Sequence, residues 1–365
     1  MLKASVRTLR ALYRARVPTL VWGPPGVGKT AMIEALAEEA GAVLLVPHVR
    51  APEDMAVPVP VHRDGEVAEV RVVPTSAFAE AVRAAQAGRP AIVFLDELNT
   101  LSAATMAAAL RFLDSGRLGD TRLPENVWRV GAANPPEMSA GGRWLPPPAA
   151  NRLIHLEYIP SAQEWAEGIL TGWGRGWNPD SQSWALVRGL LAAFMRARPE
   201  LLLRVPSDPV EASGPWPSPR SWTMGGRAMS ALLDDGASLV EAAVILEAAV
   251  GPGPAAEFIS WVRDLDLPDP EMLLDQPSLF DWAGHPADRC FAALSGVVAY
   301  AVSRPDFQDT WKKAWRLVGH VFAIRKDVAI VAARPLAQAW VKNPRLGIPE
   351  ELGQLLPFLR EVGAL

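Results

Sequence analysis

The sequence predicts an α/β domain built on a parallel five-stranded sheet sandwiched by helices, followed by an all-helical region. Up to about residue 158, short apolar runs alternate with helical patterns, and beyond residue 160 only the helical patterns continue. Runs that are apolar along their whole length and separated by helices are typical of strands buried on both faces of a parallel sheet. The chain has 365 residues, 50% of them hydrophobic, so two or three domains with sizeable cores are expected.

Five apolar runs supply the predicted strands. In chain order they are "PTLVWG", "AVLLVPH", "PAIVFLDE", "NVWRVGAAN" and "RLIHLEY". Between the first two, "TAMIEALAEEAG" has helical spacing and a stop at Gly41. A helix is also expected within the first sixteen residues, where Val6, Leu9, Leu12 and Tyr13 share one face. Because this segment is basic and lacks acids, an organelle transit peptide is the alternative.

Two segments interrupt the alternation, and a helical half follows. Val57 to Pro74 alternates around Asp64-Gly65 and predicts a β-hairpin, while "DSGRLGDTRLPEN" contains a second possible turn. Later helical patterns are "SWALVRGLLAAFMRA", "SLVEAAVILEAAVG", "DRCFAALSGVVAYAV" and "WKKAWRLVGHVFAI". Boundaries near residue 160 and residues 251–254 divide the chain into predicted domains 1–160, 161–250 and 251–365.

Composition narrows the class of protein. The net charge of −4 argues against broad nucleic-acid binding, which usually requires a basic excess. Cys290 is the single cysteine, so the chain has no internal disulfide and fits a reducing compartment. The five histidines lack metal-ligand spacing. No apolar run approaches the roughly 20 residues that span a bilayer, so a soluble, cytoplasmic protein without membrane contact is expected.

The stretch "VWGPPGVGKT" predicts a phosphate-binding loop. Gly23, Gly28, Lys29 and Thr30 match G-x-x-x-x-G-K-[ST], and the match lies between a predicted strand and a predicted helix. Glycines let backbone N–H groups turn toward phosphates, and the helix aims its positive end at them. We expect Lys29 to reach the β and γ phosphates and Thr30 to hold Mg²⁺. The predicted nucleotide contacts are Gly23, Pro24, Pro25, Gly26, Val27, Gly28, Lys29, Thr30, Ala31 and Asp96.

Two more strand ends carry polar residues suited to nucleotide hydrolysis. "IVFLDE" places Asp96 to hold the Mg²⁺ shell with Thr30, and Glu97 to orient and activate water. "VGAANPPE" ends a strand in Asn134, which in a parallel sheet lies beside the phosphates and can bridge the attacking water and the γ-phosphate. Solvated loop acids at Asp96 and Glu97, and a turn-forming asparagine before Pro135, are the structural alternatives.

With these parts assembled, the sequence resembles the AAA+ ATPases, and among them the MoxR-type branch. The motifs that carry the resemblance are "GPPGVGKT", "VRAPEDMAVPVP", "IVFLDELN", "VGAANPPE", "LPPPAANRLIHLEY" and "PSPRSW". It covers roughly residues 17–249, and beyond that only "DLPDPEMLL" is similar. The resemblance implies a P-loop NTPase sheet, a helical lid over residues 161–250 and a helical C-terminal extension.

The resemblance also implies roles for matching residues. Asn134 corresponds to sensor 1, and Arg220 in "PSPRSW" to sensor 2, which reaches from the lid to the γ-phosphate. Arg152 in "AANRL" corresponds to the arginine finger that serves a neighbouring subunit, with Arg143 as the other candidate. Each arginine has a surface or interface salt bridge as its structural alternative. A guanidinium at the transferring phosphoryl group is typically worth ~10³–10⁵ in rate.

The family implies a homo-oligomeric ring, usually of six subunits, that hydrolyses ATP to remodel or activate a client protein, often one with a von Willebrand factor A domain. The Val57–Pro74 hairpin is the candidate client-engaging element, although Val57 stands where the family pattern has a glycine. A nucleic-acid motor and a nucleotide-gated scaffold are the alternative functions. Arg63 and Arg71 favour the motor, but Asp64, Glu66 and Glu69 nearly cancel their charge.

Overall fold

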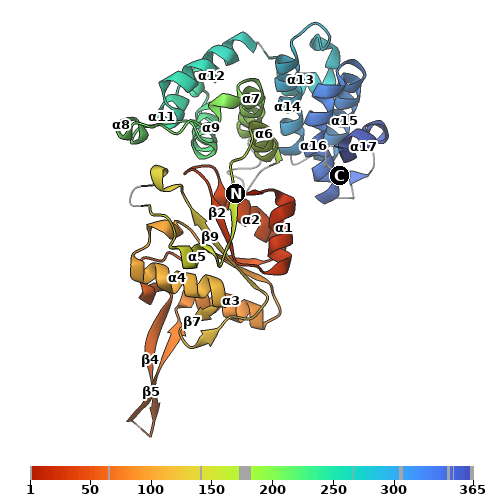
Figure 1. Ribbon diagram of the computed structural model, residues 1–365. Helices are drawn as coiled ribbons and strands as arrows, with labels where there is room; N and C mark the ends of the chain where they lie inside the picture. The colour runs from red at the N-terminus through yellow and green to blue at the C-terminus, as the bar shows by residue number, and fades with distance from the viewer. Residues whose placement is uncertain are drawn as a thin grey trace. The chain divides into compact units, whose positions relative to one another are not determined.

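The computed structural model describes residues 2–64, 66–139, 142–171, 182–265, 267–303, 307–342, 346–347 and 349–361. The chain divides into two compact units, Met1–Ile159 and Pro160–Leu365. The first is an α/β unit and the second is helical throughout its described part (Figure 1). The predicted change from alternating strands and helices to helices alone therefore falls at this division.

The α/β unit is built on one sheet in which all paired strands run parallel. Its order is β1-β10-β2-β9-β6-β3, which brings strands from distant parts of the sequence side by side. The strands are β1 (Leu2–Lys3), β2 (Thr19–Trp22), β3 (Val43–Leu45), β6 (Ala91–Leu95), β9 (Val127–Ala133) and β10 (Ile154–Glu157). The parallel α/β fold class is thus confirmed.

The sheet has six strands, not the five predicted. The extra strand is β1, which pairs with β10 through Leu2 and Lys3 at the sheet edge. Both of its residues are exposed. A two-residue exposed edge strand produces no buried apolar run, so the sequence pattern contains no signal for it.

Helices cover both faces of the sheet because successive strand residues point to opposite sides. Val21 joins the cluster formed with α1 (Val6–Ala15) and α2 (Lys29–Glu39), whereas its neighbour Leu20 joins the cluster formed with α3 (Ser76–Gln86) and α4 (Ala103–Ser115). Figure 1 shows α1 with α2, and α3 with α4, on the two sides. This arrangement leaves the ends of the strands, between the two helix layers, available for a site.

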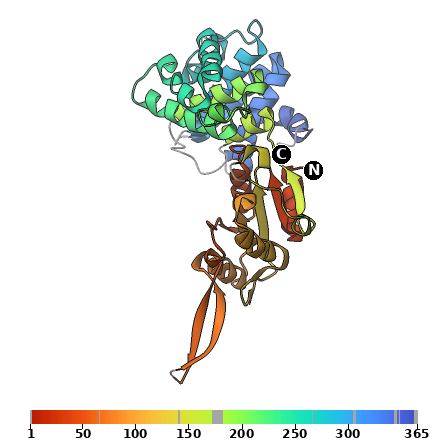
Figure 2. The same ribbon diagram turned by 60° about the vertical axis from the view of Figure 1, so that its left-hand side comes forward.

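A long hairpin projects from the α/β unit, as predicted. It pairs β4 (Ala56–Arg63) with β5 (Glu66–Pro74) antiparallel, and Figure 2 shows it extending away from the sheet. The turn residue Gly65 lies outside the described residues. The second predicted turn is a small hairpin of β7 (Arg117–Leu118) and β8 (Thr121–Arg122).

The small hairpin holds the base of the long one. The backbone of Asp120 donates to the Val72 carbonyl (2.9 Å), and the Asp120 carboxylate accepts from the Val72 N–H (2.8 Å). Gly119 has a φ of +58°, and a Cβ at this position would lie 2.3 Å from the Val72 carbonyl oxygen. The close approach therefore requires glycine.

Short elements complete the α/β unit and lie in the loops between strands and helices. They are η1 (Pro52–Asp54), η2 (Leu98–Thr100), η3 (Pro136–Met138) and α5 (Pro147–Ala150).

The helical unit packs around α7 (Gln182–Ala197) and α14 (Ala287–Ser303). These two helices approach closely at a pair of glycines, since a Cβ on Gly189 would lie 3.0 Å from the backbone nitrogen of Gly296. One continuous cluster of buried apolar residues runs from Trp165 to Leu359, with Trp222, Trp311 and Trp315 almost fully enclosed. These three tryptophans therefore belong to the core of this unit.

The remaining helical elements surround this pair. They are α6 (Ala162–Thr171), η4 (Pro199–Leu201), α8 (Pro209–Ala212), α9 (Pro219–Asp234), α10 (Leu239–Ala243), α11 (Leu246–Val250), α12 (Pro252–Leu265), α13 (Pro270–Asp275), η5 (Pro277–Leu279), α15 (Phe307–Ile324), α16 (Lys326–Lys342) and α17 (Glu350–Glu361).

The single helix predicted in "SLVEAAVILEAAVG" is wrong, because the segment breaks into α10 and α11. At the break, the N–H groups of Val244 and Ile245 donate to carbonyls three residues earlier, both at 3.3 Å. Such bonds tighten the turn and interrupt the α-helical ladder. Two adjacent β-branched residues, which are weak helix formers, occupy the break.

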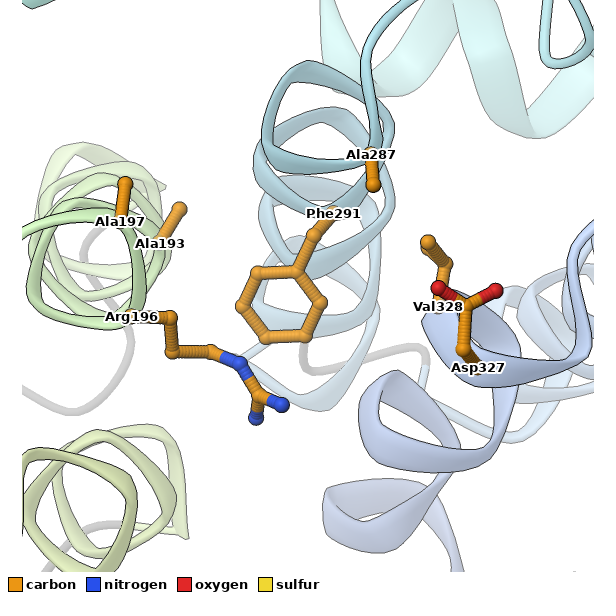
Figure 3. A pocket seen from close by; sticks show the side chains of 7 residues that line it. All are labelled: Ala193, Arg196, Ala197, Ala287, Phe291, Asp327 and Val328. Atoms are coloured by element: carbon orange, nitrogen blue, oxygen red, sulfur yellow. The ribbon is translucent and has the colours of Figure 1, made fainter.

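The helical unit also encloses a cavity of about 210 Å³ between α7, α14 and α16. Figure 3 shows Phe291 between Arg196 on one side and Asp327 on the other. The guanidinium of Arg196 lies over the Phe291 ring, 4.5 Å from its centroid. None of the residues predicted to bind nucleotide lines this cavity. Among the described residues, no helix is both long and apolar enough to cross a bilayer.

Candidate functional site

The predicted phosphate loop follows the end of β2 and leads directly into α2. Gly26 and Gly28 have φ values of +77° and +94°, a region that glycine enters without steric cost. Gly23 is required for a different reason, since a Cβ there would lie 2.4 Å from the carbonyl oxygen of Tyr158. Pro24 and Val27 are buried within the loop, and Pro25 is half-buried. The loop conformation therefore depends on all three glycines.

The N-terminus of α2 lacks a side-chain cap. Its N-cap residue is Gly28, which has no side chain that could accept from the first N–H groups, such as that of Ala31. By contrast, Ser5 caps α1 and Ser102 caps α4 in the same unit. Uncapped N–H groups at the positive end of a helix form a site for an anion.

Lys29 is the buried cation of this site. Its ammonium donates to the carbonyl oxygens of Gly23 (2.8 Å) and Pro24 (3.1 Å) and to Oδ1 of Asn134 (2.6 Å). These acceptors are neutral, so they orient the ammonium without cancelling its charge. A bound phosphate would add charge-assisted hydrogen bonds to this ammonium.

Thr30 and Asp96 meet across the loop. The hydroxyl of Thr30 donates to Oδ2 of Asp96 at 3.0 Å, and Asp96 directly follows the last residue of β6. A hydroxyl and a carboxylate are hard oxygen ligands of the kind that Mg²⁺ prefers when it also binds substrate phosphates. The donor set therefore fits the Mg²⁺ site predicted from the sequence.

Glu97 has an unusual backbone conformation beside the Mg²⁺ residues. Its φ is +52°, in the left-handed region that non-glycine residues rarely adopt, and its N–H donates to Oδ1 of Asp96 (2.9 Å). Its residue position is exposed at the carboxyl end of the sheet. A carboxylate in this position can orient a water molecule for attack on a phosphate.

Asn134 follows β9 and is tied to a residue that the sequence analysis missed. Nδ2 of Asn99 donates to the backbone carbonyl of Asn134 at 2.8 Å, and Asn99 is 1% exposed. Asn99 thereby fixes the strand end that carries Asn134 to the loop that carries Glu97. The available signal was a polar residue at the end of "IVFLDELN", where a buried amide requires a partner.

The two candidate arginine fingers lie near opposite ends of the sheet strands. The backbone N–H of Arg143 donates to the Asn99 carbonyl (3.1 Å), which places Arg143 near the carboxyl ends of the strands. Arg152 lies just before β10, whose Ile154 pairs with Thr19, the first residue of β2. There Nη1 of Arg152 lies 3.2 Å from Oδ2 of Asp114 on α4, and its side chain is 54% exposed.

Arg220 belongs to the helical unit, as the second residue of α9. Ser218 caps this helix in a reciprocal pair with Ser221. Arg220 itself is exposed. A cation in the first turn of a helix interacts unfavourably with the helix dipole, so Arg220 does not stabilise α9 by its charge. A contact to an anion would account for the arginine.

The sequence comparisons agree with this geometry. Residues 19–139 match the family described as "ATPase family associated with various cellular activities (AAA)". The matched region begins with β2 and includes the phosphate loop, Asp96, Glu97 and Asn134. The chain therefore contains an AAA ATPase family domain.

Two proteins are similar to this chain over about a third of its length. The chain is 32% identical over 123 residues to Cell division control protein 48 homolog B of Arabidopsis thaliana, covering 33% of this chain and 17% of that protein. It is 40% identical over 143 residues to human ATPase family gene 2 protein homolog B, covering 36% of this chain and 17% of that protein. The chain thus spans about a sixth of the length of each of these relatives.

Solved structures also align with the chain. A RuvB variant from Thermotoga maritima aligns with a TM-score of 0.36 and 15% identity, over 78% of each chain. A putative ATPase from Cytophaga hutchinsonii aligns with a TM-score of 0.30 and 17% identity, over 67% of this chain and 80% of that one.

Proposed function

We propose that this protein is an ATP hydrolase of the AAA+ class that works in an oligomeric ring and uses hydrolysis to remodel or activate a partner protein. The observation that carries the proposal is the convergence of Lys29, Thr30, Asp96 and Asn134 on the uncapped start of α2. An uncapped helix N-terminus, a buried ammonium group and a hydroxyl–carboxylate pair together match a nucleoside triphosphate with its Mg²⁺.

In this proposal each residue acts on a defined part of the substrate. Lys29 and the α2 N–H groups bind the β and γ phosphates, while Thr30 and Asp96 hold Mg²⁺. When bound, Mg²⁺ supplies neutralisation of the charge that develops on the phosphate oxygens. Glu97 orients and activates the attacking water, and Asn134 contacts both that water and the γ-phosphate. Asn99 positions Asn134 through its backbone carbonyl.

The position of Arg152 supports a site shared between subunits. Arg152 precedes β10, near the amino ends of the strands, whereas the phosphate loop follows β2, at the carboxyl ends of the strands. Because Arg152 and the phosphate loop of the same chain lie at opposite strand ends, we infer that its guanidinium serves a nucleotide bound by another copy of the chain. A head-to-tail contact of this kind repeats around a closed ring, and the MoxR-type resemblance suggests six subunits.

The client-engaging element in this proposal is the hairpin of β4 and β5. It projects from the α/β unit and exposes Val59, Val67 and Val70, which are 40%, 57% and 60% exposed. Apolar side chains on a projecting ribbon are suited to contact with a protein. The MoxR-type resemblance favours a client with a von Willebrand factor A domain.

The described hairpin residues do not favour a nucleic-acid motor. Arg71 is paired with Glu69 at 2.8 Å, so its charge is partly neutralised within the hairpin. Because nucleic-acid binding depends on cationic groups that replace counterions, this pairing favours a protein client.

The test is the substitution Glu97→Gln in the full chain. It is expected to retain ATP and Mg²⁺ binding by calorimetry while phosphate release falls about 10³-fold, since the amide cannot take a proton from water. Glu80→Gln is the matched control, because Glu80 is an exposed acid on α3 and its loss should change neither quantity. Near-normal phosphate release by Glu97→Gln protein would refute the assigned role of Glu97.

The same variant tests the client class. A protein that copurifies with Glu97→Gln chain in ATP and Mg²⁺, and is released when the nucleotide is removed, supports remodelling. Loss of this copurification when Val67→Ser and Val70→Ser are added to the Glu97→Gln chain assigns the contact to the hairpin. Recovery of nuclease-sensitive nucleic acid in place of protein would contradict the proposed client class.

A further inference from the structure

A second cavity lies in the α/β unit, near the amino ends of the sheet strands, whereas the phosphate loop lies at their carboxyl ends. It has a volume of about 370 Å³ and is lined by residues from the ends of α1 and α4, the β8 turn and the start of β9. Val127, the first residue of β9, lines it, whereas Asn134 follows the last residue of the same strand. No residue of the proposed ATP site lines this cavity.

Three arginines from separate segments converge on this cavity. Arg16 comes from the end of α1, Arg122 from β8 and Arg129 from β9. The single acid in the lining is Glu125. Within the described part of the chain, no ion pair involves any of the three guanidiniums. With Glu125 in the lining and Asp114 acting on Arg129, the three guanidiniums still leave an excess of positive charge that a bound anion would offset.

Two of the three guanidiniums are held in place by helix C-termini. Nη1 of Arg129 donates to the carbonyl oxygens of Phe112 (3.3 Å) and Asp114 (2.8 Å) at the end of α4. Nη1 of Arg16 donates to the Tyr13 carbonyl (2.9 Å) at the end of α1, and its guanidinium lies over the Tyr13 ring. A guanidinium has five N–H donors, so these bonds orient both groups and leave donors for a ligand.

The neighbouring backbone keeps the cavity open beside Arg129. Gly116 ends α4 with a φ of +66°, and a Cβ there would lie 3.2 Å from Nη1 of Arg129. Partial burial lowers the pKa of Arg129, the carboxylate of Asp114 opposes that shift, and the positive charge of Arg122 adds to it. Arg129 therefore has both an acid, Asp114, and a like charge, Arg122, near it at this cavity.

We propose that Arg16, Arg122 and Arg129 form a second anion site that binds the phosphate group of a small phosphorylated molecule. Planar guanidinium forks match the oxygens of a phosphate. The cavity volume falls within the range of small-molecule sites and leaves room beyond the phosphate group. Free inorganic phosphate shares the same chemistry and is the other possible source of the group.

The experiment is calorimetric titration of the full chain with inorganic phosphate and, separately, with ribose 5-phosphate. The protein is first saturated with Mg²⁺ and a non-hydrolysable ATP analogue, so that the proposed ATP site is filled. We expect a Kd at or below about 1 mM for at least one probe. Arg122→Gln should weaken this binding about tenfold or more, because each charge-assisted hydrogen bond is worth about that factor.

Arg117→Gln is the matched control. Arg117 is the cross-strand partner of Arg122 and is exposed, but it does not line the cavity. It removes the same charge from the same small hairpin, so its binding should equal that of the unmodified chain. Thermal unfolding of both variants checks that the hairpin is retained.

The titrations distinguish a phosphorylated small molecule from free inorganic phosphate and can also overturn the proposed site. Tighter binding of ribose 5-phosphate identifies a phosphorylated small molecule, and tighter binding of inorganic phosphate identifies the free ion, provided that Arg122→Gln weakens either. No binding of either probe at 10-fold above about 1 mM overturns the proposal. Equal losses in Arg122→Gln and Arg117→Gln would also overturn it, because they would reflect general surface charge.

Discussion

The helix starts of α2 and α9 are built in opposite ways, although the resemblance to AAA+ ATPases implies a nucleotide contact at both. At α2 the N-cap is Gly28 and no side chain accepts from the first turn. At α9, Ser218 accepts from the Ser221 N–H and the Ser221 hydroxyl accepts from the Ser218 N–H. One helix start is left open, and the other is closed by its own side chains.

The difference shows how a helix N-terminus becomes either a site or a stabilising element. The α2 start has no side-chain cap and lies beside buried Lys29, so both the helix dipole and the ammonium favour a bound anion there. At α9 the Ser221 N–H is already bonded to the Ser218 hydroxyl, and the exposed side chain of Arg220 is the group available for an anion. The α/β unit therefore binds through its backbone, while the helical unit would act through one long side chain.

The largest expected effect is on ATP turnover, when the arginine that a neighbouring subunit would supply to the α2 site is removed. Arg152→Ala is expected to retain ATP binding while turnover falls about 10³-fold, because the guanidinium would stabilise charge on the transferring phosphoryl group of a neighbouring subunit. Steady-state phosphate release at saturating ATP measures the loss. Arg143→Ala is the matched comparison, and a larger loss there than in Arg152→Ala would reassign the finger to Arg143.

A mixing experiment then tests whether the site is shared. Arg152→Ala chains still carry an intact phosphate loop, and Lys29→Ala chains still carry Arg152. Rings assembled from both variants should recover part of the activity that each has lost. Mixed rings that form, as checked by differently tagged chains, but stay inactive would contradict action in trans.

The second prediction concerns ATP affinity when the buried lysine at the start of α2 is removed. Lys29→Ala is expected to weaken ATP binding about 100-fold, because it removes the buried cation that would contact the β and γ phosphates. Calorimetry on the full chain measures this loss. Lys312→Ala, which removes an exposed lysine of α15, is the control and should bind ATP as the unmodified chain does. Unchanged affinity in Lys29→Ala would contradict the phosphate-loop assignment.

A smaller effect is expected at the closed helix start. Arg220→Ala should lower turnover about 10-fold to 100-fold with little change in stability, because Arg220 is exposed and its charge opposes the dipole of α9. Phosphate release and urea unfolding are measured together. Arg263→Ala, at an exposed arginine of α12, is the matched control. Loss of stability without loss of turnover would make Arg220 a structural residue.

The smallest effect separates capping from ligand binding. Ser218→Ala should lower the free energy of unfolding by about 1 kcal/mol, because the first turn of α9 loses its acceptor. Ser218→Gly should cost only a few tenths of that amount, as glycine is tolerated at an N-cap. Urea unfolding of both variants measures the difference. Equal losses from the two substitutions would show that packing around Ser218, not the cap, stabilises this start.

The parallel α/β fold could be predicted because its signals are local. Each buried strand is a continuous apolar run, and the hairpin of β4 and β5 alternates along its length. The phosphate loop was predicted from one contiguous stretch in which Gly26, Gly28 and Lys29 each have a defined physical role. The same logic failed at β1, where two exposed residues gave no pattern, and at Val244, where backbone bonds break a helix that the apolar spacing continued.

The amino-acid sequence by itself determined five of the six sheet strands and the residue types of the proposed ATP site, because apolar periodicity and loop chemistry act between near neighbours. Only the tertiary structure decided which distant residues meet. It joined Asn99 to Asn134 and Arg152 to Asp114, and it gathered Arg16, Arg122 and Arg129 at one cavity. Such meetings depend on sheet order and on where helices end, which set distances that spacing along the chain does not encode.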